Sequence, residues 1–392
     1  MKENTTHKKL IRITTVPMAL RYLLPGQMQF MQQNGFEVIM ISADGPELQE
    51  VIQNEQCRHI IVPMTRKITP LQDLKCLWQL IKIFRKEKPD IVHSHTPKAG
   101  LLGMLAAKIS GVKIRIHTVA GMPLMVEKGA KLSLLKFIEK LTYSAAKQVW
   151  PNSNSLYQYI VDHKFTAPEK LHVIGKGSTN GINTNRFNRA VLQQNILQEV
   201  KASIGYDPQN TYLLCIGRLV ADKGIVELVN VFLSLQQNNP ALRLVLVGDY
   251  EEELDPLPAA TMEQVKNNSN ILHIRWTQQV EYFMATANYF IFPSHREGFP
   301  NVLLQAGAMQ LPIICSRIAG NVDIVTHQQT GLIFDTANET QMKELATFAL
   351  NDPGKMQSMA DSLHQQIVNN YQRENMWQNI LSAYKSLLNL NH

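Results

Sequence analysis

The chain has 392 residues, of which 45% are hydrophobic and 18% are charged. This composition excludes an intrinsically disordered protein, and the length suffices for two domains, each with its own core. The net charge of +7 is unevenly distributed, because residues 1–190 hold 27 Lys and Arg against 13 Asp and Glu, whereas the remainder holds 12 against 19. The first half is therefore expected to face an anionic ligand or surface, unless its basic face is simply solvated.

The four cysteines form no CxxC pair and lie within or beside apolar runs. They indicate a reduced, cytoplasmic compartment and argue against a zinc site. The basic and polar amino-terminal sequence lacks the apolar core of a signal peptide, and no run of about 18 apolar residues predicts a membrane-spanning helix. The first expected strand also lacks a GxGxxG motif, so a dehydrogenase has little support.

In the first half, short apolar runs that are typical of β-strands alternate with helical patterns. The expected strands cover residues 9–16, 36–42, 59–64, 90–95 and 113–120. Two amphipathic helices are expected within residues 71–90 and 127–150, with these apolar stripes: Leu71, Leu74, Leu77 or Trp78, Ile81 and Phe84, and then Leu134, Ile138 and Leu141. The stripes are expected to pack on a sheet, and the surrounding lysines can also contact anionic lipid headgroups.

The second half repeats this alternation, with expected strands at residues 211–217, 242–248, 270–276, 289–294 and 311–316. Nearly continuous apolar strands with helices between them predict parallel sheets that are covered on both faces. Two such sets predict two doubly wound domains, whose ligand sites lie at the carboxyl ends of the strands. The expected linker covers residues 175–187, and the last helix either crosses back to the first domain or packs on the second.

The segment CIGRLVADKG follows an expected strand and supplies two cations and two glycines. Arg218 offers a fork of hydrogen-bond donors, Lys223 offers a point charge, and the glycines allow close approach of the backbone. Such a loop suits a diphosphate group, although an Arg and a Lys in this position also fit a solvent-facing loop. Gly248 and Asp249 end the next expected strand and by themselves indicate only a turn.

The segment HREGFPNVLLQAGAM places Glu297 in a tight loop before an expected helix. Pro300 suits the first turn of that helix, and the amides of Asn301 and Val302 would form an anion site at its N-terminus. Gln305 lies about five residues into the helix, roughly 7 Å along it. Glu297 and Gln305 can therefore line one wall of a site, or Glu297 only caps the helix and supports its dipole.

Taken together, GRLVADKG, VGD and PSHREGFPNVLLQAGAMQLPII resemble the retaining glycosyltransferases of family 4, which have the GT-B architecture. DIVHSHTPKAGLLGMLAAKISGVKIRIHTVAGMP and GSTNGINTNRF resemble the bacterial members that build capsular and lipid-linked polysaccharides. The resemblance covers nearly the whole chain. It implies an α/β fold of two Rossmann-like doubly wound parallel-sheet domains that face a central cleft. The acceptor domain would cover residues 1–187 with a helix at about 373–392 crossing back, and the donor domain would cover residues 188–372.

The resemblance also implies roles for individual residues. Arg218 and Lys223 would stabilise the leaving nucleoside diphosphate, Glu297 would hold hydroxyls of the transferred sugar, and Gln305 would hold the donor ribose. Arg218, Lys223 and Glu297 are thus the expected catalytic residues. The full expected donor set is Gly217, Arg218, Lys223, Gly248, Arg275, Glu297, Gly298, Phe299, Asn301, Val302 and Gln305.

Two positions depart from the pattern of this family. The histidine that it usually places near the reacting sugar is replaced by Ala120, and strand alternation puts His117 on the opposite side. The expected acceptor-side residues are His95, His117 and Gly121. Gln305 replaces a glutamate, but its carbonyl oxygen still accepts a hydrogen bond from a ribose hydroxyl. The lost charge assistance is worth on the order of 1 kcal/mol.

The implied reaction transfers a sugar, with retention, from a nucleoside diphosphate sugar, expected to be UDP-linked, to a polyprenyl-diphosphate-linked saccharide. The expected partners are the nucleotide sugar, the lipid-linked saccharide and an anionic membrane surface, with no nucleic acid. No cofactor and no metal are expected. The resemblance implies a cytoplasmic protein at the inner face of the bacterial inner membrane. The alternatives are a UDP-sugar 2-epimerase of the same fold and a catalytically inert relative that binds a partner or the acceptor.

Overall fold

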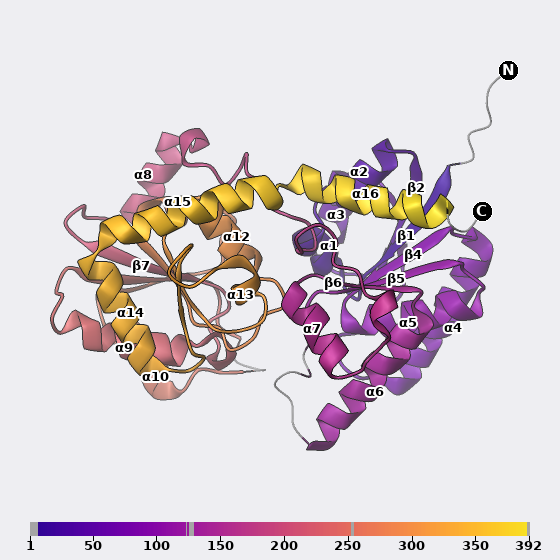
Figure 1. The fold of residues 1–392 in the computed structure, drawn as a ribbon, viewed down its shortest axis with the longest axis horizontal. Coiled ribbons are helices and arrows are strands. Elements are labelled where there is room, and N and C mark those ends of the chain that lie inside the picture. The colour runs from indigo at the N-terminus through magenta and orange to yellow at the C-terminus, as the bar shows by residue number, and fades with distance from the viewer. Residues whose placement is uncertain (1–6, 123, 125–128, 252–254, 390–392) are drawn as a thin grey trace. The chain divides into compact units, whose positions relative to one another are not determined.

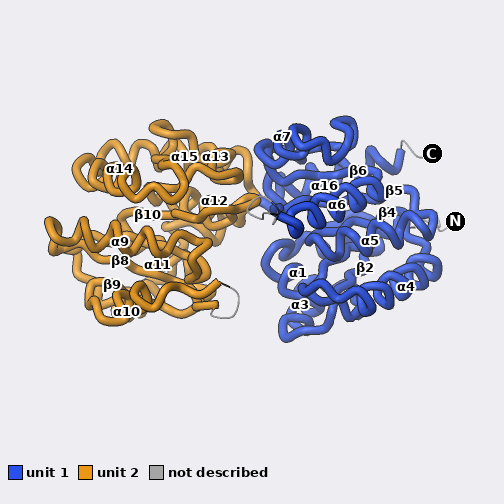
Figure 2. The backbone as a smooth tube through the Cα atoms, turned by 90° about the horizontal axis from the view of Figure 1, so that it is seen from below, with its two compact units in different colours: residues 1–181, 373–392 blue, residues 182–372 orange. Residues whose placement is uncertain are grey.

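The computed structural model describes residues 7–122, 124, 129–251 and 255–389. The chain forms two compact units, which comprise residues 1–181 with 373–392 (unit 1) and residues 182–372 (unit 2) (Figure 2). The change of unit therefore follows residue 181, whereas the sequence analysis placed it after residue 187. The expected linker at 175–187 is not a separate segment, because its two parts belong to the cores of different units.

Contacts on both sides of residue 181 explain this position. The side-chain oxygen of Asn180 accepts hydrogen bonds from Gln27 (2.9 Å) and Trp377 (2.6 Å), all within unit 1. The amide of Ile182 donates to the carbonyl of Tyr371 at 2.7 Å, within unit 2. Phe187 is buried in the core of unit 2, so the five residues before it are already part of that unit.

Unit 1 contains a parallel six-stranded sheet with the order β3-β2-β1-β4-β5-β6 (Figure 1). Its strands are β1 (Lys8–Ile13), β2 (Phe36–Ser42), β3 (Arg58–Ile61), β4 (Ile91–His95), β5 (Ile114–Val119) and β6 (Gln148–Pro151). Its helices are α1 (Pro17–Leu23), α2 (Gln27–Gln33), α3 (Leu48–Glu55), α4 (Pro70–Glu87), α5 (Pro97–Ile109), α6 (Gly129–Ala145), α7 (Asn154–Asp162) and α16 (Arg373–Asn389). Along β1, Leu10 faces the α2 and α16 side, whereas Ile11 and Ile13 face the side of α4 and α5.

Unit 2 contains a second parallel six-stranded sheet, with the order β12-β11-β10-β7-β8-β9. Its strands are β7 (Thr211–Ile216), β8 (Leu242–Val247), β9 (Ile271–Ile274), β10 (Tyr289–Phe292), β11 (Ile313–Ser316) and β12 (Leu332–Phe334). Its helices are α8 (Gln194–Ser203), α9 (Ile225–Gln236), α10 (Ala259–Asn267), α11 (Val280–Thr286), α12 (Asn301–Ala308), α13 (Asn321–Ile324), α14 (Glu339–Asn351) and α15 (Pro353–Asn370). Buried clusters on both faces of the sheet show that this unit is also doubly wound.

The two sheets have the same topology. In each unit, the first three strands of the chain are added one after another toward one edge of the sheet, and the next three are added toward the other edge. The winding therefore reverses between β1 and β4 in unit 1 and between β7 and β10 in unit 2. This is the strand order of a Rossmann fold, in which ligands bind outside the carboxyl ends of the strands at the reversal. The expected fold class of two doubly wound parallel-sheet domains is confirmed.

The expected packing stripe of the helix α4 is only partly correct. Ile81 and Phe84 are buried, but Leu71, Leu74 and Trp78 are 81%, 54% and 58% exposed. The residues that contact the core instead include Cys76 and Leu80, which the sequence analysis did not assign to the stripe. The helix carries apolar residues on two faces, and the sheet covers only one of them. On α6, Leu134 is likewise exposed, and residues 127–128 of that expected helix lie outside the described part of the chain.

The helix α16 packs within unit 1, where Ile380 and Tyr384 are buried against the sheet. The hydroxyl of Tyr384 lies 2.5 Å from a guanidinium nitrogen of Arg12 and 2.5 Å from Nδ1 of His93. These polar contacts satisfy a hydroxyl that is enclosed by apolar side chains. No described helix is long and apolar enough to cross a membrane.

Candidate functional site

The loops after β7 and β10 meet at the reversal of winding in unit 2. Gly224, the N-cap residue of α9, has a φ of 68°, and a Cβ atom there would lie 2.3 Å from the carbonyl oxygen of Pro293, which follows β10. Only glycine permits both this backbone conformation and this close approach. The contact brings the segment that carries Lys223 directly against the segment that carries Glu297.

The loops after β7 and β8 are equally close to one another. Gly248 has a φ of 147°, and a Cβ atom at this position would lie 1.9 Å from the carbonyl oxygen of Gly217. The amide of Gly217 donates to Val247 at 3.0 Å, and the amide of Gly248 donates to Ile274 at 2.9 Å. Gly217 and Gly248 therefore shape the carboxyl edge of the sheet, and neither adds a side chain that would cover it.

Lys223 and Glu297 form an ion pair, with 2.5 Å between Nζ and Oε1. Their side chains are 16% and 20% exposed, so both groups are largely enclosed but still reach solvent. The hydroxyl of Ser294 lies 3.2 Å from the same carboxylate oxygen. The structure thus brings together two of the three expected catalytic residues, which are 74 positions apart in the sequence.

Further contacts fix the loop that carries Glu297. The amide of His295 donates to the carbonyl of Asp222 at 2.9 Å, and Nε of Arg296 lies 2.9 Å from the Asp222 carboxylate. Nε2 of His295 lies 3.0 Å from the carboxylate of Glu227 in α9. The hydrogen bond with Glu227 raises the pKa of His295, and the same contact lowers the pKa of Glu227. The sequence analysis missed these supporting residues, because their pairing follows only from the folded loops.

The helix α12 begins at Asn301, and Pro300 is its N-cap residue rather than a residue of the first turn. Within the described chain, no side chain caps this end, which leaves the amides of Asn301 and Val302 available to an anionic ligand. Glu297 does not cap the helix, because its carboxylate is paired with Lys223. The side chain of Gln305, in the second turn, is partly exposed.

The turn before α12 is held by backbone contacts. A Cβ atom on Gly320 would lie 2.5 Å from the carbonyl oxygen of Gly298, so this turn packs directly on the start of α13. The ring of Phe299 is buried against Tyr371, with 5.6 Å between ring centroids. Gly298 and Phe299 can therefore offer a ligand only their backbone.

Two arginines of the expected donor set lie nearer the surface. Arg218 is about half exposed and forms an ion pair with Glu251. The Arg275 side chain is 88% exposed, and its Nε lies 3.4 Å from the Asp249 carboxylate. The same carboxylate accepts a hydrogen bond from the amide of Trp276 at 3.2 Å. Arg218 is thus held at the edge of the sheet, whereas Arg275 projects into solvent.

In unit 1, the reversal of winding lies between the ends of β1 and β4. The hydroxyls of Thr15 and Thr96 are 2.8 Å apart there, and Thr96 has a φ of 74°. His95 is 2% exposed, its ring lies 4.3 Å from that of His93, and neither of its ring nitrogens has a hydrogen-bond partner among the described residues. Burial lowers the pKa of His95 well below its ordinary value, so the ring is neutral near pH 7.

His117 does not lie at this open edge. Its ring is 3% exposed, its Nδ1 lies 2.9 Å from the hydroxyl of Ser94, and a Cβ atom on Gly100 would approach the ring to 2.4 Å. Burial lowers its pKa to about 4. The ring is enclosed between β5 and α5, which gives no geometric support to the expected acceptor-side role. Gly121, by contrast, follows the end of β5 with a φ of 151°.

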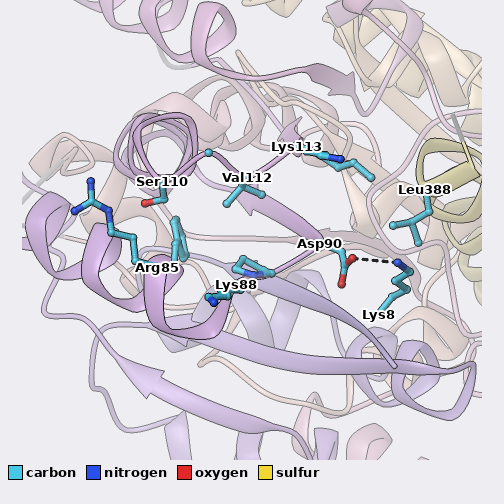
Figure 3. Close-up of a pocket in the computed structure, with 12 residues that line it drawn as sticks. Lys8, Arg85, Lys88, Asp90, Ser110, Val112, Lys113 and Leu388 are labelled. Atoms are coloured by element: carbon cyan, nitrogen blue, oxygen red, sulfur yellow. Dashed lines mark hydrogen bonds and ion pairs between the residues drawn. The ribbon is translucent and has the colours of Figure 1, made fainter. Parts of the chain in front are cut away.

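A pocket of about 510 Å³ lies at the opposite, amino end of the unit 1 strands (Figure 3). Lys88 and Ser110, in its wall, are the C-cap residues of α4 and α5, and Lys8 is paired with Asp90 at 3.3 Å. Cations at helix C-termini complement the helix dipole. The basic lining of this pocket therefore has a structural explanation, and the pocket lies away from the edge at which doubly wound sheets bind ligands.

In the described residues, no group of three or more His, Cys, Asp or Glu side chains is arranged to hold a metal ion. The four cysteines are free and buried. At the unit 2 edge, the expected donor residues supply the cations Arg218 and Lys223, the carboxylate of Glu297 and the amides that begin α12.

Comparisons with known proteins agree with this geometry. Residues 198–367 match the family described as Glycosyl transferases group 1, and residues 13–153 match Glycosyl transferase 4-like proteins. The capsular polysaccharide biosynthesis glycosyltransferase CapM of Staphylococcus aureus is 32% identical over 97% of this chain and 98% of its own length. The UDP-Gal:alpha-D-GlcNAc-diphosphoundecaprenol alpha-1,3-galactosyltransferase of Escherichia coli is 23% identical over 95% of both chains.

Among solved structures, a glycosyltransferase from Rickettsia africae has a TM-score of 0.80 to this chain, with 18% identity, and the match covers 98% of this chain and 99% of the other. This likeness shows the GT-B fold. CapM is 32% identical to this chain over nearly the whole of both chains, and this similarity shows the family. The chain therefore belongs to the group 1 glycosyltransferases, as its motifs predicted.

Proposed function

We propose that this glycosyltransferase moves a sugar, with retention, from a UDP-sugar to a polyprenyl-diphosphate-linked saccharide in the synthesis of a bacterial surface polysaccharide. The single observation that carries the proposal is the meeting of Lys223 with Glu297 beside the uncapped N-terminus of α12. Cation, carboxylate and amides lie at the reversal of winding, where a nucleotide binds in doubly wound sheets.

The roles follow from the chemistry of each group. The diphosphate would lie between Lys223, Arg218 and the amides of Asn301 and Val302, which all favour negative charge. The carboxylate of Glu297 would accept hydrogen bonds from hydroxyls of the sugar, and the carbonyl oxygen of Gln305 would accept one from the ribose. These groups account for the donor without a metal ion or another cofactor.

In the proposed reaction, the bond between the anomeric carbon and the oxygen of the β-phosphate breaks. A new bond forms between that carbon and the acceptor oxygen, on the face from which the diphosphate leaves. The proton of the acceptor hydroxyl passes to a departing phosphate oxygen, so no protein base is required. Lys223, Arg218 and the dipole of α12 would stabilise the charge that develops on the diphosphate.

Two observations support these proposed substrates. The name of the E. coli relative specifies a UDP-sugar donor and a diphosphoundecaprenol-linked acceptor, and the S. aureus relative is named for capsular polysaccharide biosynthesis. Residues 1–190 also hold a surplus of cations, which suits the diphosphate of such an acceptor and an anionic membrane surface. The proposed location is the cytoplasmic face of the bacterial inner membrane.

The test uses the purified chain, a panel of UDP- and GDP-sugars and a polyprenyl-diphosphate-linked monosaccharide. We expect nucleotide release and a product larger by one sugar, with the anomeric configuration of the donor by NMR. Glu297→Ala and Lys223→Ala should each lower transfer at least ~100-fold while circular dichroism stays unchanged. Glu199→Ala, at an exposed position of unit 2, should leave transfer unchanged. Release of an isomerised nucleotide sugar without acceptor would favour an epimerase, and the absence of turnover with every donor would contradict the proposal.

A further inference from the structure

The outer face of α4 exposes large apolar side chains next to lysines. Leu71, Leu74 and Trp78 are 81%, 54% and 58% exposed, and Lys75 and Lys82 are exposed among them. Their spacing places all five on one side of the helix. The opposite side of α4 already packs on the core, so this is a second apolar face with no partner in the described part of unit 1.

Neighbouring segments extend this face. Ile68, just before α4, is 63% exposed, and on α6 Leu134 and Phe137 are 47% and 63% exposed. The helix α5 lies between α4 and α6 and contacts both (Figure 1). We define the docking face as Ile68, Leu71, Leu74, Lys75, Trp78, Lys82, Leu134, Phe137 and Lys140.

The apolar residues of the docking face lie toward the carboxyl edge of the unit 1 sheet. A helix that follows a parallel strand begins at the carboxyl end of that strand and runs back toward the amino end. The helix α4 follows β3 and α6 follows β5, and the exposed apolar side chains all precede the midpoint of their helix or lie next to it. The same edge carries His95 and Gly121, the expected acceptor-side residues.

The exposed charge on α4, α5 and α6 is positive. These helices contain three carboxylates in the described chain, and none of them is free at the surface. Asp73 is paired with Lys98 at 2.7 Å, Glu87 is paired with Lys9 at 3.1 Å and with Arg58, and Glu139 is buried. The cations around the apolar side chains are therefore not neutralised by acids on the same helices.

We propose that the docking face binds an anionic lipid bilayer, with Trp78 and the leucines at the boundary between headgroups and acyl chains and the lysines on lipid phosphates. Tryptophan and lysine are the residues that favour this boundary, and apolar area combined with positive charge is what membrane-surface helices use. A second copy of the chain fits poorly, because two faces of the same positive charge repel one another. The docking face would present the acceptor edge of unit 1 to a lipid-linked saccharide, and in this respect the inference rests on the proposed function.

The test is cosedimentation of the full chain with vesicles of phosphatidylcholine alone or with one quarter phosphatidylglycerol. We expect binding only to the anionic vesicles, and weaker binding at high salt. Each lysine near such a surface contributes about fivefold in affinity, so Lys75→Glu with Lys82→Glu should weaken binding at least ~25-fold. Leu71→Ser with Trp78→Ser should weaken it at least ~10-fold even at low salt, because apolar area is lost.

Matched controls come from the amino edge of the same unit. Ile109 is 53% exposed and Lys113 is exposed, and neither belongs to the docking face. Ile109→Ser and Lys113→Glu should bind vesicles as the unaltered chain does. All variants should retain transfer to a short-chain, water-soluble analogue of the acceptor, because the docking face lies outside the donor site.

Three results would overturn the inference. The first is that the unaltered chain does not bind anionic vesicles. The second is that the control variants lose as much binding as the docking-face variants. The third is that light scattering shows a dimer, which Leu71→Ser with Trp78→Ser dissociates. Failure of the proposed function is distinguishable, since vesicle binding would then persist without sugar transfer. Transfer to the soluble analogue without vesicle binding would mean that the function stands and the docking face does not.

Discussion

Glu139 allows a quantitative prediction about the stability of unit 1. It lies on α6, is 7% exposed, and burial raises its pKa from 4.5 to about 7. Between these two pH values the folded state binds more protons than the unfolded state, so the free energy of unfolding falls as the pH rises. Above pH 7 the loss is complete, and at 1.36 kcal/mol per pKa unit it amounts to about 3 kcal/mol as an upper limit.

Glu139→Gln removes this titration and keeps the shape of the side chain. We expect the variant to resemble the native chain at pH 5, where Glu139 is protonated when folded, and to be more stable by up to about 3 kcal/mol at pH 8. For a unit of this size, 1 kcal/mol corresponds to about 2–4 °C in the midpoint of thermal unfolding. The midpoint should therefore rise by about 10 °C or less at pH 8.

Tryptophan fluorescence during urea unfolding is a suitable assay, because three of the four tryptophans, Trp78, Trp150 and Trp377, lie in unit 1. Glu169→Gln, at an exposed position of the same unit, is the control and should change stability little at either pH. An equal gain for Glu139→Gln at pH 5 and pH 8, or none at pH 8, would refute the reasoning that Glu139 is held protonated.

Three further predictions concern unit 2. Lys223→Met should lower kcat by about 10²–10³, with a smaller change in KM, because in the proposed function its charge acts mainly on the departing diphosphate. An equal fall for an exposed lysine variant would argue against this. At pH values below the raised pKa of His295, His295→Gln should lower the midpoint of thermal unfolding, and at higher pH it should make little difference. The reason is that the ion pair with Glu227 stabilises the fold only while His295 is protonated. Because the pair is partly exposed, its contribution is limited to about 1 kcal/mol. Gln305→Glu should tighten UDP binding by about fivefold in calorimetry if Gln305 contacts the ribose, and an unchanged affinity would remove it from the site.

Most of the fold could be predicted from the sequence, because buried parallel strands appear as apolar runs that require no knowledge of their neighbours. The two strands that were missed show the limit of this signal. The strand β6 has four residues and is separated from the end of α6 by two residues, and its first three residues were assigned to that helix. The strand β12 has only three residues. Such short segments become strands because β5 and β11 offer them paired backbone groups, which no local pattern reveals.

The exposed face of α4 was missed for a different reason. The helix has apolar residues at positions that fit two stripes, and periodicity alone does not show which stripe faces the sheet. The correct stripe includes Cys76 and Leu80, and the other includes Leu71 and Trp78. The ambiguity in the sequence is itself informative, because a helix that is apolar on both sides must find a partner for each.

The candidate donor site shows how topology brings two ordinary sequence segments together. Neither a lysine after β7 nor a glutamate after β10 indicates a ligand by itself, and the sequence alone left both open to simpler interpretations. The reversal of winding makes β7 and β10 neighbours, and Gly224 lets their loops touch, so that Lys223 and Glu297 meet.

In the free chain each of these enclosed charges is the counterion of the other, which avoids the cost of an unpaired buried charge. A nucleotide sugar offers phosphate oxygens to the lysine and hydroxyls to the carboxylate, so the pair can be divided between two parts of one ligand without leaving either charge unpaired. In the proposed function, the ion pair thus keeps both side chains in position until the nucleotide sugar binds.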